Sequence, residues 1–472
     1  MTIDTLRAQL ENASSVPREW RSMRGLIQPL LDFFKNRYPG PHGREISLGF
    51  VPGRIEVLGR HTDYAGGRTL VCAIDRGFLC VASPNRLGLV RMAEDSQEFS
   101  PVEFPIELAI TPRVGHWSNY PMTMARRLIR NFGPSVSLAG VDVAFTSTLP
   151  VGSGMSGSSA LMMMSFLAIA AVNRLHDAPF FRENIRDGID LAMYLACAEN
   201  GQSFRELSGD KGVGTFGGSE DHAAILNGRD GHLSLFRFRP ASLEEELRWP
   251  REWRMVVAFS GVRAEKTREA LDKYNLVARR AGLAVKEYNR LFTARCHTLR
   301  EVAAHAKSKL GLHWMDEVEK KLAAGSRFGR ELALADRLRQ FVLEDRRFIP
   351  AAVRALRERD LESFGRNLSA SHRASRSCLL NIVPEIDFLH RSALRLGAAG
   401  ASGFGAGFGG SIVAVLPAAD ADGFRAEWER SYAKRHPDRA AEASFFPASP
   451  GTGIRLWDAD GPARYVERIF QA

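Results

Sequence analysis

The sequence predicts an α+β fold with two lobes, and three observations support this prediction. Stretches rich in β-branched and aromatic residues occur early in the chain, at Ile46–Leu58 and Thr69–Ser83, which is typical of strands. Strong helical patterns fill much of the second half. Each half also contains a loop dense in glycine, and such loops permit unusual backbone angles where strands and helices meet.

The first lobe is predicted to span residues 1–245. Residues 1–45 place apolar side chains at helical spacing and form a leading helical segment. The two strands named above follow, and Val141–Ser147 is a further strand because it alternates apolar and small residues. A loop rich in Gly and Ser then leads into a long apolar helix from about Ser158 to Arg174.

The second lobe is predicted to span residues 246–472. The segment RMVVAFSG, which follows Trp253, predicts a strand at its start. A Gly-rich loop at Gly397–Gly410 feeds another strand at Ser411–Leu416, and a final α/β segment ends the lobe. Helical patterns lie between these strands, over residues 264–310, 313–324, 328–346, 350–358 and 361–370.

The composition indicates an ordinary soluble globular protein, with 45% apolar and 25% charged residues. The longest apolar stretch, Ala160–Val172, is too short to span a bilayer and predicts a buried helix, and no secretory signal is visible. The 5 cysteines are scattered without a C-x-x-C pair, so we expect a reduced, cytoplasmic protein. The net charge of +10 comes from basic residues mixed with acids, so we expect no specific nucleic-acid partner, no membrane partner and a monomer or weak oligomer.

The segment LPVGSGMSGSSALMMM, residues 149–164, predicts a binding loop for phosphate. Its glycines permit close approach of the backbone to a ligand, and the free N–H groups and dipole at the start of the following helix attract an anion. Its serine hydroxyls add further donors or a Mg²⁺ ligand. No G-K-[ST] closes the segment, so it is not a Walker A loop. The alternative is a flexible turn that leads into a core helix.

A second segment, PGRIEVLGRHTDYAGG at residues 52–67, predicts a site for a polyol. A strand ends here in a loop that carries charged and polar side chains, namely Arg54, Arg60, His61, Asp63 and Tyr64. Asp and His side chains form paired hydrogen bonds with neighbouring hydroxyls, and a buried site of this kind discriminates strongly between ligands. The alternative is a solvated hairpin tip.

Two further segments carry candidate functional residues. In GGSEDHAAIL, residues 217–226, Asp221 lies at the edge of an apolar run, where a carboxylate can be desolvated and paired with Arg54. The alternative for Asp221 is a helix N-cap. In GFGAGFGGS, residues 403–411, the glycines either let the second lobe approach a bound nucleotide or pack against the neighbouring lobe.

Together the four segments resemble the GHMP kinase superfamily, and within it the galactokinase family. Residues 52–67 resemble the family's sugar-binding signature, P-G-R-x-x-x-x-G-E-H-T-D-Y-x-x-G, and LPVGSGMSGSSAL resembles its phosphate loop, L-P-x-G-x-G-L-S-S-S-A. The segment GFGAGFGGS resembles the third motif, T-G-A-G-F-G-G-C. The matches keep the family order from residue 52 to residue 416, so the resemblance covers most of the chain.

The resemblance implies a two-lobed GHMP kinase fold with the active site in the cleft between the lobes. It implies the cofactors ATP and Mg²⁺ and phosphorylation of the anomeric hydroxyl of galactose or a close relative. Asp221 matches the catalytic aspartate that accepts the proton of the sugar hydroxyl, and Arg54 matches the arginine that pairs with it and with the transferring phosphate. The HTDY segment disfavours a mevalonate- or homoserine-type kinase, whereas a sensor that binds sugar and ATP without turnover would need no base.

The remaining roles follow position by position from the same resemblance. The ATP phosphates are expected to contact Gly152, Ser153, Gly154, Ser156, Gly157, Ser158 and Ser159, and the nucleotide is expected to lie near Trp117. Mg²⁺ is expected at Ser158 and Glu199. The sugar is expected to contact Arg60, His61, Asp63 and Tyr274.

Departures from the family pattern leave alternatives open. The family carries Glu where this chain has Arg60, at a position that resembles a ligand of the sugar's C6 hydroxyl. Because Arg has donors only, one hypothesis is a substrate with an anionic C6, such as a uronic acid; the other is that Arg60 turns to solvent or pairs with Glu56. The stretch between Glu199 and Asp221 is longer than in the family and is expected to loop out. Glu220 either raises the pKa of the adjacent Asp221 or serves as the base itself.

Overall fold

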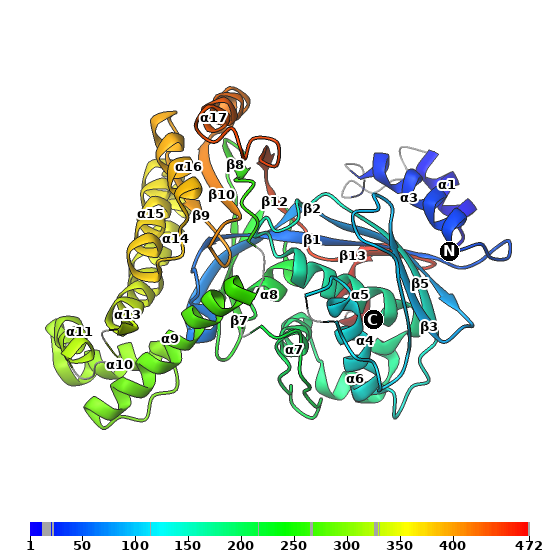
Figure 1. The fold of residues 1–472 in the computed structure, drawn as a ribbon, viewed down its shortest axis with the longest axis horizontal. Coiled ribbons are helices and arrows are strands. Elements are labelled where there is room, and N and C mark those ends of the chain that lie inside the picture. Colours follow the sequence, from blue (N-terminus) through cyan, green and yellow to red (C-terminus); the bar gives the residue numbers. More distant parts are fainter. Residues whose placement is uncertain are drawn as a thin grey trace.

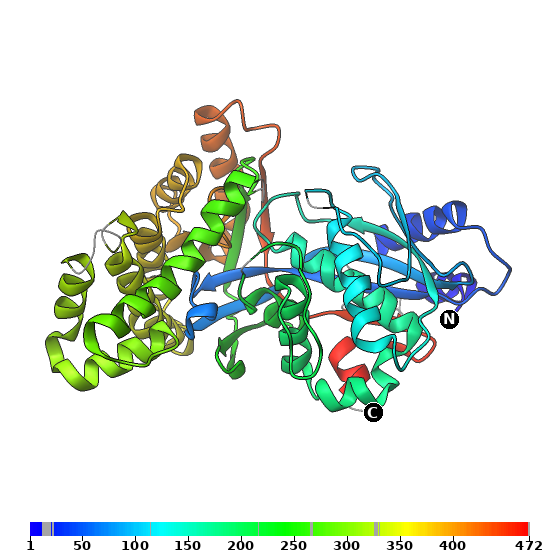
Figure 2. The same cartoon turned by 60° about the horizontal axis from the view of Figure 1, so that its bottom comes forward.

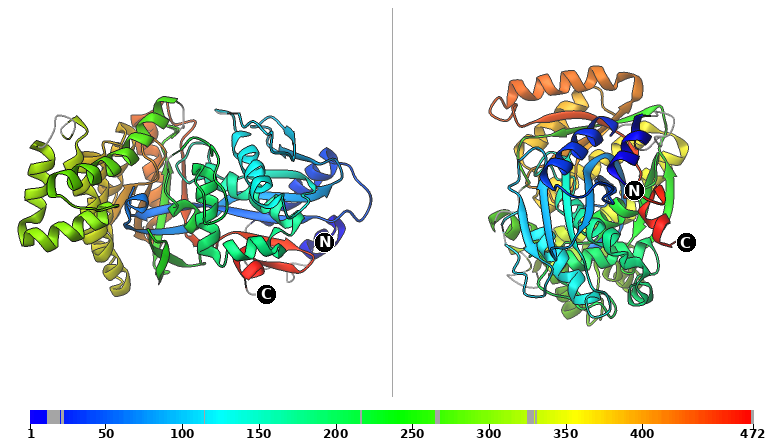
Figure 3. Two further views of the ribbon diagram at one scale, coloured as in Figure 1. Left: turned by 90° about the horizontal axis from the view of Figure 1, so that it is seen from below. Right: turned by 90° about the vertical axis from the view of Figure 1, so that its right-hand side faces the viewer.

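The computed structural model describes residues 1–11, 20, 23–113, 115–215, 217–264, 268–324, 329 and 331–470, without the side chains of residues 268–272 and 274. Two lobes lie side by side, each with its own sheet, which confirms the predicted α+β fold class (Figure 1). Both ends of the chain lie on the lobe with the larger sheet (Figure 3). None of the helices described here is long and apolar enough to cross a bilayer.

The larger sheet contains ten strands within the described residues. Its main path runs β14-β13-β1-β2-β5-β3-β4, while β12 and the β6–β7 hairpin pair with the long strand β2. Only β3 and β5 pair in parallel in this part of the chain, and the other pairs are antiparallel. The strands are β1 (Ser47–Leu58), β2 (Arg68–Asn85), β3 (Leu89–Glu94), β4 (Val102–Pro105), β5 (Gly140–Ser147), β6 (His232–Arg237), β7 (Ser242–Arg248), β12 (Pro450–Gly451), β13 (Arg455–Asp458) and β14 (Gly461–Arg464).

Helices cover both faces of the larger sheet because successive side chains of its strands point to opposite sides. In β1, Phe50 packs toward α1 and α3, whereas Val51 and Ile55 pack into the main core with α5. The helix α5 is buried from Ser159 to Ala170, as its uniformly apolar sequence predicts. The helices of this lobe are α1 (Ile3–Glu11), α3 (Arg24–Arg37), α4 (Asn119–Phe132), α5 (Gly157–Asn173), α6 (Pro179–Asn184), α7 (Gly188–Asn200), α8 (Glu220–Asn227) and α18 (Tyr465–Phe470).

The smaller sheet is antiparallel and has the order β11-β8-β10-β9. Its strands are β8 (Trp253–Phe259), β9 (Gly400–Gly403), β10 (Ser411–Pro417) and β11 (Ser444–Ala448). The helical pattern over 264–310 forms two helices, because Thr298 caps a new helix by accepting a hydrogen bond from the Glu301 N–H. The helices of this lobe are α9 (Arg268–Phe292), α10 (Leu299–Leu310), α11 (Trp314–Ala324), α13 (Leu334–Leu343), α14 (Ile349–Glu358), α15 (Leu361–Ala374), α16 (Pro384–Arg395) and α17 (Ala421–Arg435).

The predicted division into residues 1–245 and 246–472 differs from the arrangement of the sheets. Its boundary falls inside β7, which pairs with β6 in the larger sheet. The last strands also return to that sheet, because β13 pairs with β1 and buries Leu456 and Trp457. Residues 450–470 therefore belong with the first lobe.

The strands β1 and β2 extend out of the first lobe and reach the helices of the second (Figure 2). There β1 contacts α15, and β2 contacts α14. The connection between the two strands, residues 59–67, is the part of the predicted polyol segment that lies against the second lobe. This arrangement places the polar loop, residues 59–67, where both lobes meet.

Candidate functional site

A cavity of about 780 Å³ lies between the two lobes, and all four segments predicted to carry chemistry contribute to its wall. This volume is in the range of small-molecule sites. The predicted site residues that line it are Arg54, His61, Asp63, Trp117, Gly152, Ser153, Gly154, Ser156, Gly157, Ser158, Ser159, Glu199 and Asp221. Arg60 is not among the lining residues, and the side chain of Tyr274 lies outside the described residues.

Arg54 and Asp221 form an ion pair in the wall of this cavity. Both Nε and Nη2 of Arg54 lie 2.7 Å from Asp221 Oδ1, and Nη1 donates to the Gly154 carbonyl at 2.7 Å. Burial opposes the charge of Arg54, but Asp221 and Glu220 raise its pKa. The Asp221 side chain remains 29% exposed, so its carboxylate is oriented by the guanidinium and still open to the cavity.

Asp63 holds the start of the helix that carries Asp221. Its Oδ2 accepts hydrogen bonds from the N–H groups of Ser219 at 2.8 Å and Glu220 at 3.2 Å, which is the favourable place for an anion on a helix. Burial raises the pKa of Asp63, although these backbone donors oppose the shift. A Cβ at Gly218 would lie 1.5 Å from Asp63 Oδ2, so only glycine lets the two segments approach this closely.

The phosphate segment, residues 149–164, directs carbonyl groups toward hydrogen-bond donors of the protein. The Ala264 N–H donates to the Gly152 carbonyl and the Ser411 hydroxyl donates to the Ser153 carbonyl, each at 2.7 Å. Arg54 binds the next carbonyl, at Gly154. The positive end of α5 then faces the cavity, where Gly157 and Ser158 line the wall. This geometry suits an anion that accepts backbone N–H hydrogen bonds.

The Gly-rich segment of the second lobe packs against the phosphate segment. Gly405 adopts φ +74°, and a Cβ there would lie 2.6 Å from the Gly154 carbonyl oxygen. Its N–H donates to Glu56 Oε2 at 2.9 Å. Residues 405–408 also line the cavity. These glycines therefore pack against the neighbouring lobe and line the cavity, and their approach to a bound nucleotide stays a prediction.

Ser158 and Glu199 line the cavity close to the phosphate segment. Glu199 Oε2 accepts a hydrogen bond from the Ser159 hydroxyl at 2.8 Å and lies 3.1 Å from His222 Nε2. The described residues contain no cluster of three or more His, Cys, Asp or Glu side chains that could hold a metal by themselves. One carboxylate and one hydroxyl fit Mg²⁺ that takes its other ligands from phosphate and water.

Trp117 forms an aromatic part of the cavity wall. Its ring centroid lies 5.7 Å from that of Phe99 and 5.8 Å from that of Phe145, and its Nε1 donates to the Ser100 carbonyl at 3.1 Å. The flat, apolar surface is suited to a stacked ring of a ligand.

The stretch between Glu199 and Asp221 does not loop out, which corrects the expectation from its length. It folds back on α4, where Arg126 pairs with Asp210 at 2.9 Å and Arg127 donates to the Gln202 carbonyl at 2.6 Å. Its later residues line the cavity, including Val213, Thr215 and Gly217. The contacts of these two arginines with the stretch, which sequence spacing could not supply, explain the difference.

Arg60 is 3% exposed, so it neither turns to solvent nor lines the cavity. It forms no ion pair within 4 Å among the described residues, and its Nε and Nη1 have no hydrogen-bond partner. Burial lowers the pKa of Arg60, while the charges of Glu56 and Glu344 oppose the shift. The predicted contact between Arg60 and the sugar stays a prediction, and this geometry does not favour the uronic acid hypothesis.

One helical face of the second lobe holds the backbone of the polar loop, and the sequence did not indicate this. Arg337 donates to the His61 carbonyl at 2.5 Å, and Gln340 donates to the Arg60 carbonyl at 2.9 Å. On the following π-helical turn, Glu344–Phe348, the Glu344 carboxylate accepts from the Gly59 N–H at 3.2 Å. The burial of these three polar side chains appears only in the fold, so sequence reasoning had no signal to find.

The same loop fixes His61 and Tyr64. The Tyr64 hydroxyl lies 2.9 Å from His61 Nδ1, and His61 Nε2 lies 3.2 Å from the Ala406 carbonyl. Burial lowers the pKa of His61 to about 3. The imidazole is therefore neutral at physiological pH and adds no charge to the cavity.

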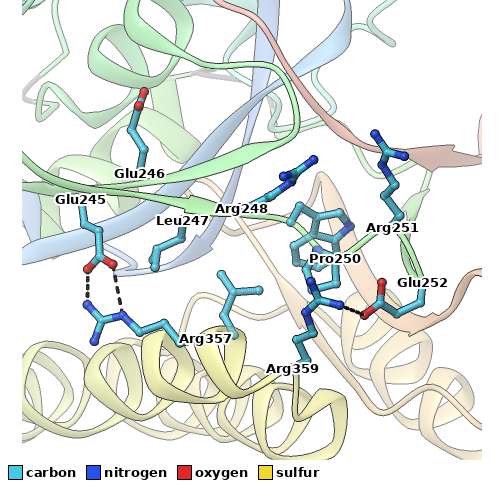
Figure 4. Close-up of a pocket in the computed structure, with 11 residues that line it drawn as sticks. Glu245, Glu246, Leu247, Arg248, Pro250, Arg251, Glu252, Arg357 and Arg359 are labelled. Atoms are coloured by element: carbon cyan, nitrogen blue, oxygen red, sulfur yellow. Dashed lines mark hydrogen bonds and ion pairs between the residues drawn. The ribbon is translucent and has the colours of Figure 1, made fainter.

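A second cavity of about 580 Å³ lies between β7 and the end of α14 (Figure 4). Two ion pairs lie in its wall, Arg357 with Glu245 and Arg359 with Glu252. None of the residues singled out in the sequence lines it. The interlobe cavity is therefore the candidate active site.

Family models match three segments of the chain. Residues 32–84 match the galactokinase galactose-binding signature, residues 119–202 match the GHMP kinase N-terminal domain, and residues 352–434 match the GHMP kinase C-terminal region. The signature contains Arg54 and the whole polar loop, and the N-terminal match contains the phosphate segment.

Similar proteins cover nearly the whole chain. The galactokinase of Enterococcus faecalis is 30% identical over 409 residues, which span 86% of this chain and 94% of that protein. The galactokinase of Homo sapiens is 29% identical over 413 residues, which span 84% and 92%. The structure of Lactococcus lactis galactokinase in complex with galactose superposes with a TM-score of 0.72 at 21% identity, covering 91% of this chain and 99% of that one, and so shares the fold.

The close contact between Gly218 and Asp63 predicts that adding one methyl group at residue 218 lowers the free energy of unfolding. In Gly218→Ala the new Cβ must displace the carboxylate that caps α8, and we expect the free energy of unfolding to fall by about 1–3 kcal/mol. Urea denaturation measures this loss. Gly282→Ala in α9 is the control, because a Cβ there meets nothing within 4 Å and should be neutral or stabilising. Equal stability of the two variants would contradict the prediction.

We expect Glu344 to make a pH-dependent contribution to the free energy of unfolding. Burial raises its pKa from 4.5 to about 7, so the folded protein holds this proton more tightly than the unfolded chain. The contribution is complete at pH values below 4.5 and is lost as the pH rises through about 7. Relative to Glu344→Gln, the wild-type protein should therefore lose up to about 3 kcal/mol of unfolding free energy between pH about 4 and about 8.

Urea denaturation over this pH range tests the linkage. The exposed Glu362 provides the control, because Glu362→Gln should follow the wild-type curve at every pH. Parallel curves for wild type and Glu344→Gln would show that Glu344 titrates normally.

Proposed function

Because the chain belongs to the galactokinase family of GHMP kinases, we propose that it transfers the γ-phosphoryl group of ATP to the anomeric hydroxyl of galactose. The observation that carries this proposal is the Arg54–Asp221 pair, which lies in the wall of the same cavity as the phosphate segment. A base for a hydroxyl and an anion-binding loop in one cavity are the parts that phosphoryl transfer to a sugar requires.

Asp221 is the proposed base. As the sugar oxygen forms its bond to the γ-phosphorus, the bond between that phosphorus and the β,γ-bridging oxygen breaks, ADP leaves, and the hydroxyl proton passes to Asp221. Arg54 keeps the Asp221 carboxylate in one orientation and places positive charge beside the transferring group. Asp63 contributes by fixing the start of α8, and His61 lines the cavity as a neutral imidazole.

Glu220 is the weaker candidate for the base. Its Oε1 lies 3.5 Å from Arg54 Nε, compared with 2.7 Å for Asp221 Oδ1. Its side chain is 11% exposed, whereas that of Asp221 is 29% exposed. Asp221 is therefore both better oriented by Arg54 and more accessible to a substrate hydroxyl.

The phosphates of ATP would occupy the mouth of the segment from Gly152 to Ser159, at the positive end of α5. Ser158 and Glu199 would hold Mg²⁺, which neutralises charge on the β- and γ-phosphates when bound. Trp117 offers its aromatic face for the nucleotide. The monomeric or weakly associated, cytoplasmic state expected from the sequence stays a prediction.

A sensor that binds sugar and ATP without turnover is the alternative function. It would not need a carboxylate that is oriented by a buried arginine and open to the cavity, as Asp221 is. The geometry therefore favours the kinase.

Asp221→Asn distinguishes these two functions. The amide keeps the shape of the side chain but accepts no proton, so sugar-dependent ADP release should fall by about 10²–10⁴-fold. Galactose binding, measured by calorimetry, should change little. Asp230→Asn, at an exposed position beyond the same helix, is the control and should retain full turnover. Undiminished turnover in Asp221→Asn would exclude Asp221 as the base, and absence of turnover in the wild type would favour the sensor.

A further inference from the structure

His222 is a buried imidazole in the wall of the interlobe cavity, and the proposed mechanism does not use it. It directly follows Asp221 in the first turn of α8, is 2% exposed and lines the cavity. Its Nε2 lies 3.1 Å from Oε2 of Glu199, the carboxylate proposed to hold the metal. Neither ring nitrogen has a hydrogen-bond partner within the part of the chain that the structure describes. A buried polar group of this kind is costly unless a ligand satisfies it.

The contact between His222 and Glu199 lacks the direction of a hydrogen bond. The two atoms are close enough for one, but the ring does not direct Nε2 along the line that joins them. Neighbouring ligands of one octahedral ion show this relation, because each points at the metal and not at the other ligand. With bonds of about 2.1 Å to the metal, two such ligands lie about 3 Å apart, which agrees with the separation of Nε2 and Oε2.

The surroundings of Glu199 suit a cation. Glu199 lies in the last turn of α7, where the carbonyl end of a helix carries partial negative charge. The Ser159 hydroxyl donates to the same Oε2 at 2.8 Å, which fixes the orientation of the carboxylate. No group of three His, Cys, Asp or Glu side chains that could hold a metal occurs in the described residues, so a bound ion takes its other ligands from hydroxyl, phosphate and water oxygens.

We propose that His222 Nε2 and the Glu199 carboxylate together ligate the divalent metal of the nucleotide complex, so that the site holds a transition metal such as Mn²⁺ more tightly than Mg²⁺. The inference rests on the proposed kinase function of the same cavity, because the phosphates of the nucleotide supply further ligands. Mg²⁺ prefers oxygen ligands alone, whereas an imidazole nitrogen favours transition metals. The neutral tautomer with its proton on Nδ1 leaves the lone pair of Nε2 for the metal.

Adjacent residues of one helical turn then carry the proposed base and a metal ligand. Asp63 fixes this turn by accepting hydrogen bonds from the N–H groups of Ser219 and Glu220. The base and the metal therefore keep a constant separation, which positioned catalysis of phosphoryl transfer requires.

Pulsed EPR of bound Mn²⁺ tests the ligation directly. The sample is the full-length protein with Mn²⁺ and a non-hydrolysable ATP analogue, because a nitrogen bound to Mn²⁺ modulates the electron spin echo. We expect a directly bound nitrogen in the wild type, and labelling histidine with ¹⁵N should change its modulation pattern. The signal should be absent from His222→Gln and retained in His116→Gln. His116 is the matched control because it lines the same cavity and its Nδ1 contacts the Ser118 hydroxyl.

Metal affinity gives a second readout that needs no turnover. Calorimetry with the same analogue measures the dissociation constants of Mn²⁺ and Mg²⁺. In His222→Gln the constant for Mn²⁺ should rise by about tenfold or more, whereas the constant for Mg²⁺ should change less, because the lost ligand is a nitrogen. His116→Gln should match the wild type for both metals, and urea denaturation checks that His222→Gln is folded.

The outcomes separate this proposal from the kinase function. Absence of a directly bound nitrogen in the wild type, or its persistence in His222→Gln, overturns the metal ligand, while turnover of galactose would leave the kinase function standing. A bound nitrogen that His222→Gln removes supports the metal site even if no sugar is phosphorylated, and the kinase function alone then fails.

A variant that does not fold leaves the proposal testable. The described part of the cavity wall contains three imidazoles, on His61, His116 and His222. If His222→Gln is unfolded, retention of the ¹⁵N-sensitive signal in both His61→Gln and His116→Gln assigns it to His222. Its loss in either of these two variants overturns the proposal.

Discussion

The buried guanidinium of Arg54 is the interaction on which the arrangement of the site depends. It lies on β1 and binds the Asp221 carboxylate on α8 and the Gly154 carbonyl of the phosphate segment at once. Three elements that are far apart in the sequence thereby acquire fixed relative positions. An arginine is suited to this role because its fork of donors can bind two acceptors in defined directions, which a lysine cannot. The ion pair is partly buried, so removing either partner would leave an uncompensated charge in the cavity wall.

The second lobe completes the site by holding the first lobe's loops through their backbone groups. Arg337, Gln340 and Glu344 bind the polypeptide of residues 59–61, and Ser411 binds the phosphate segment at Ser153. Hydrogen bonds to the main chain fix the path of a loop and leave its side chains available to a ligand. The polar face of α13 and the π-helical turn therefore positions the polar loop without entering the cavity, and both lobes contribute to the site.

The sequence predicted local features well because local chemistry determines them. The strands β1, β2 and β5 and the apolar helix α5 follow the predicted ranges closely, and the phosphate segment lies at a helix start because its glycines permit the turn. The direction of Arg60 could not be predicted, because it depends on Glu56 and Glu344, which approach from different elements. The return of β13 to the first sheet and the folding of residues 202–213 onto α4 are likewise set by tertiary partners, which no pattern within those segments specifies.

The two parts of the cavity differ in the charged and polar groups that line them. Where the phosphates are expected, the wall offers backbone groups, the positive end of α5 and the Glu199 carboxylate, which is proposed to hold Mg²⁺. Beside the proposed base Asp221, the wall carries the carboxyl groups of Glu56, Asp63 and Glu220. The first set suits an anion that arrives with its metal, whereas the second suits the hydroxyl donors of a sugar.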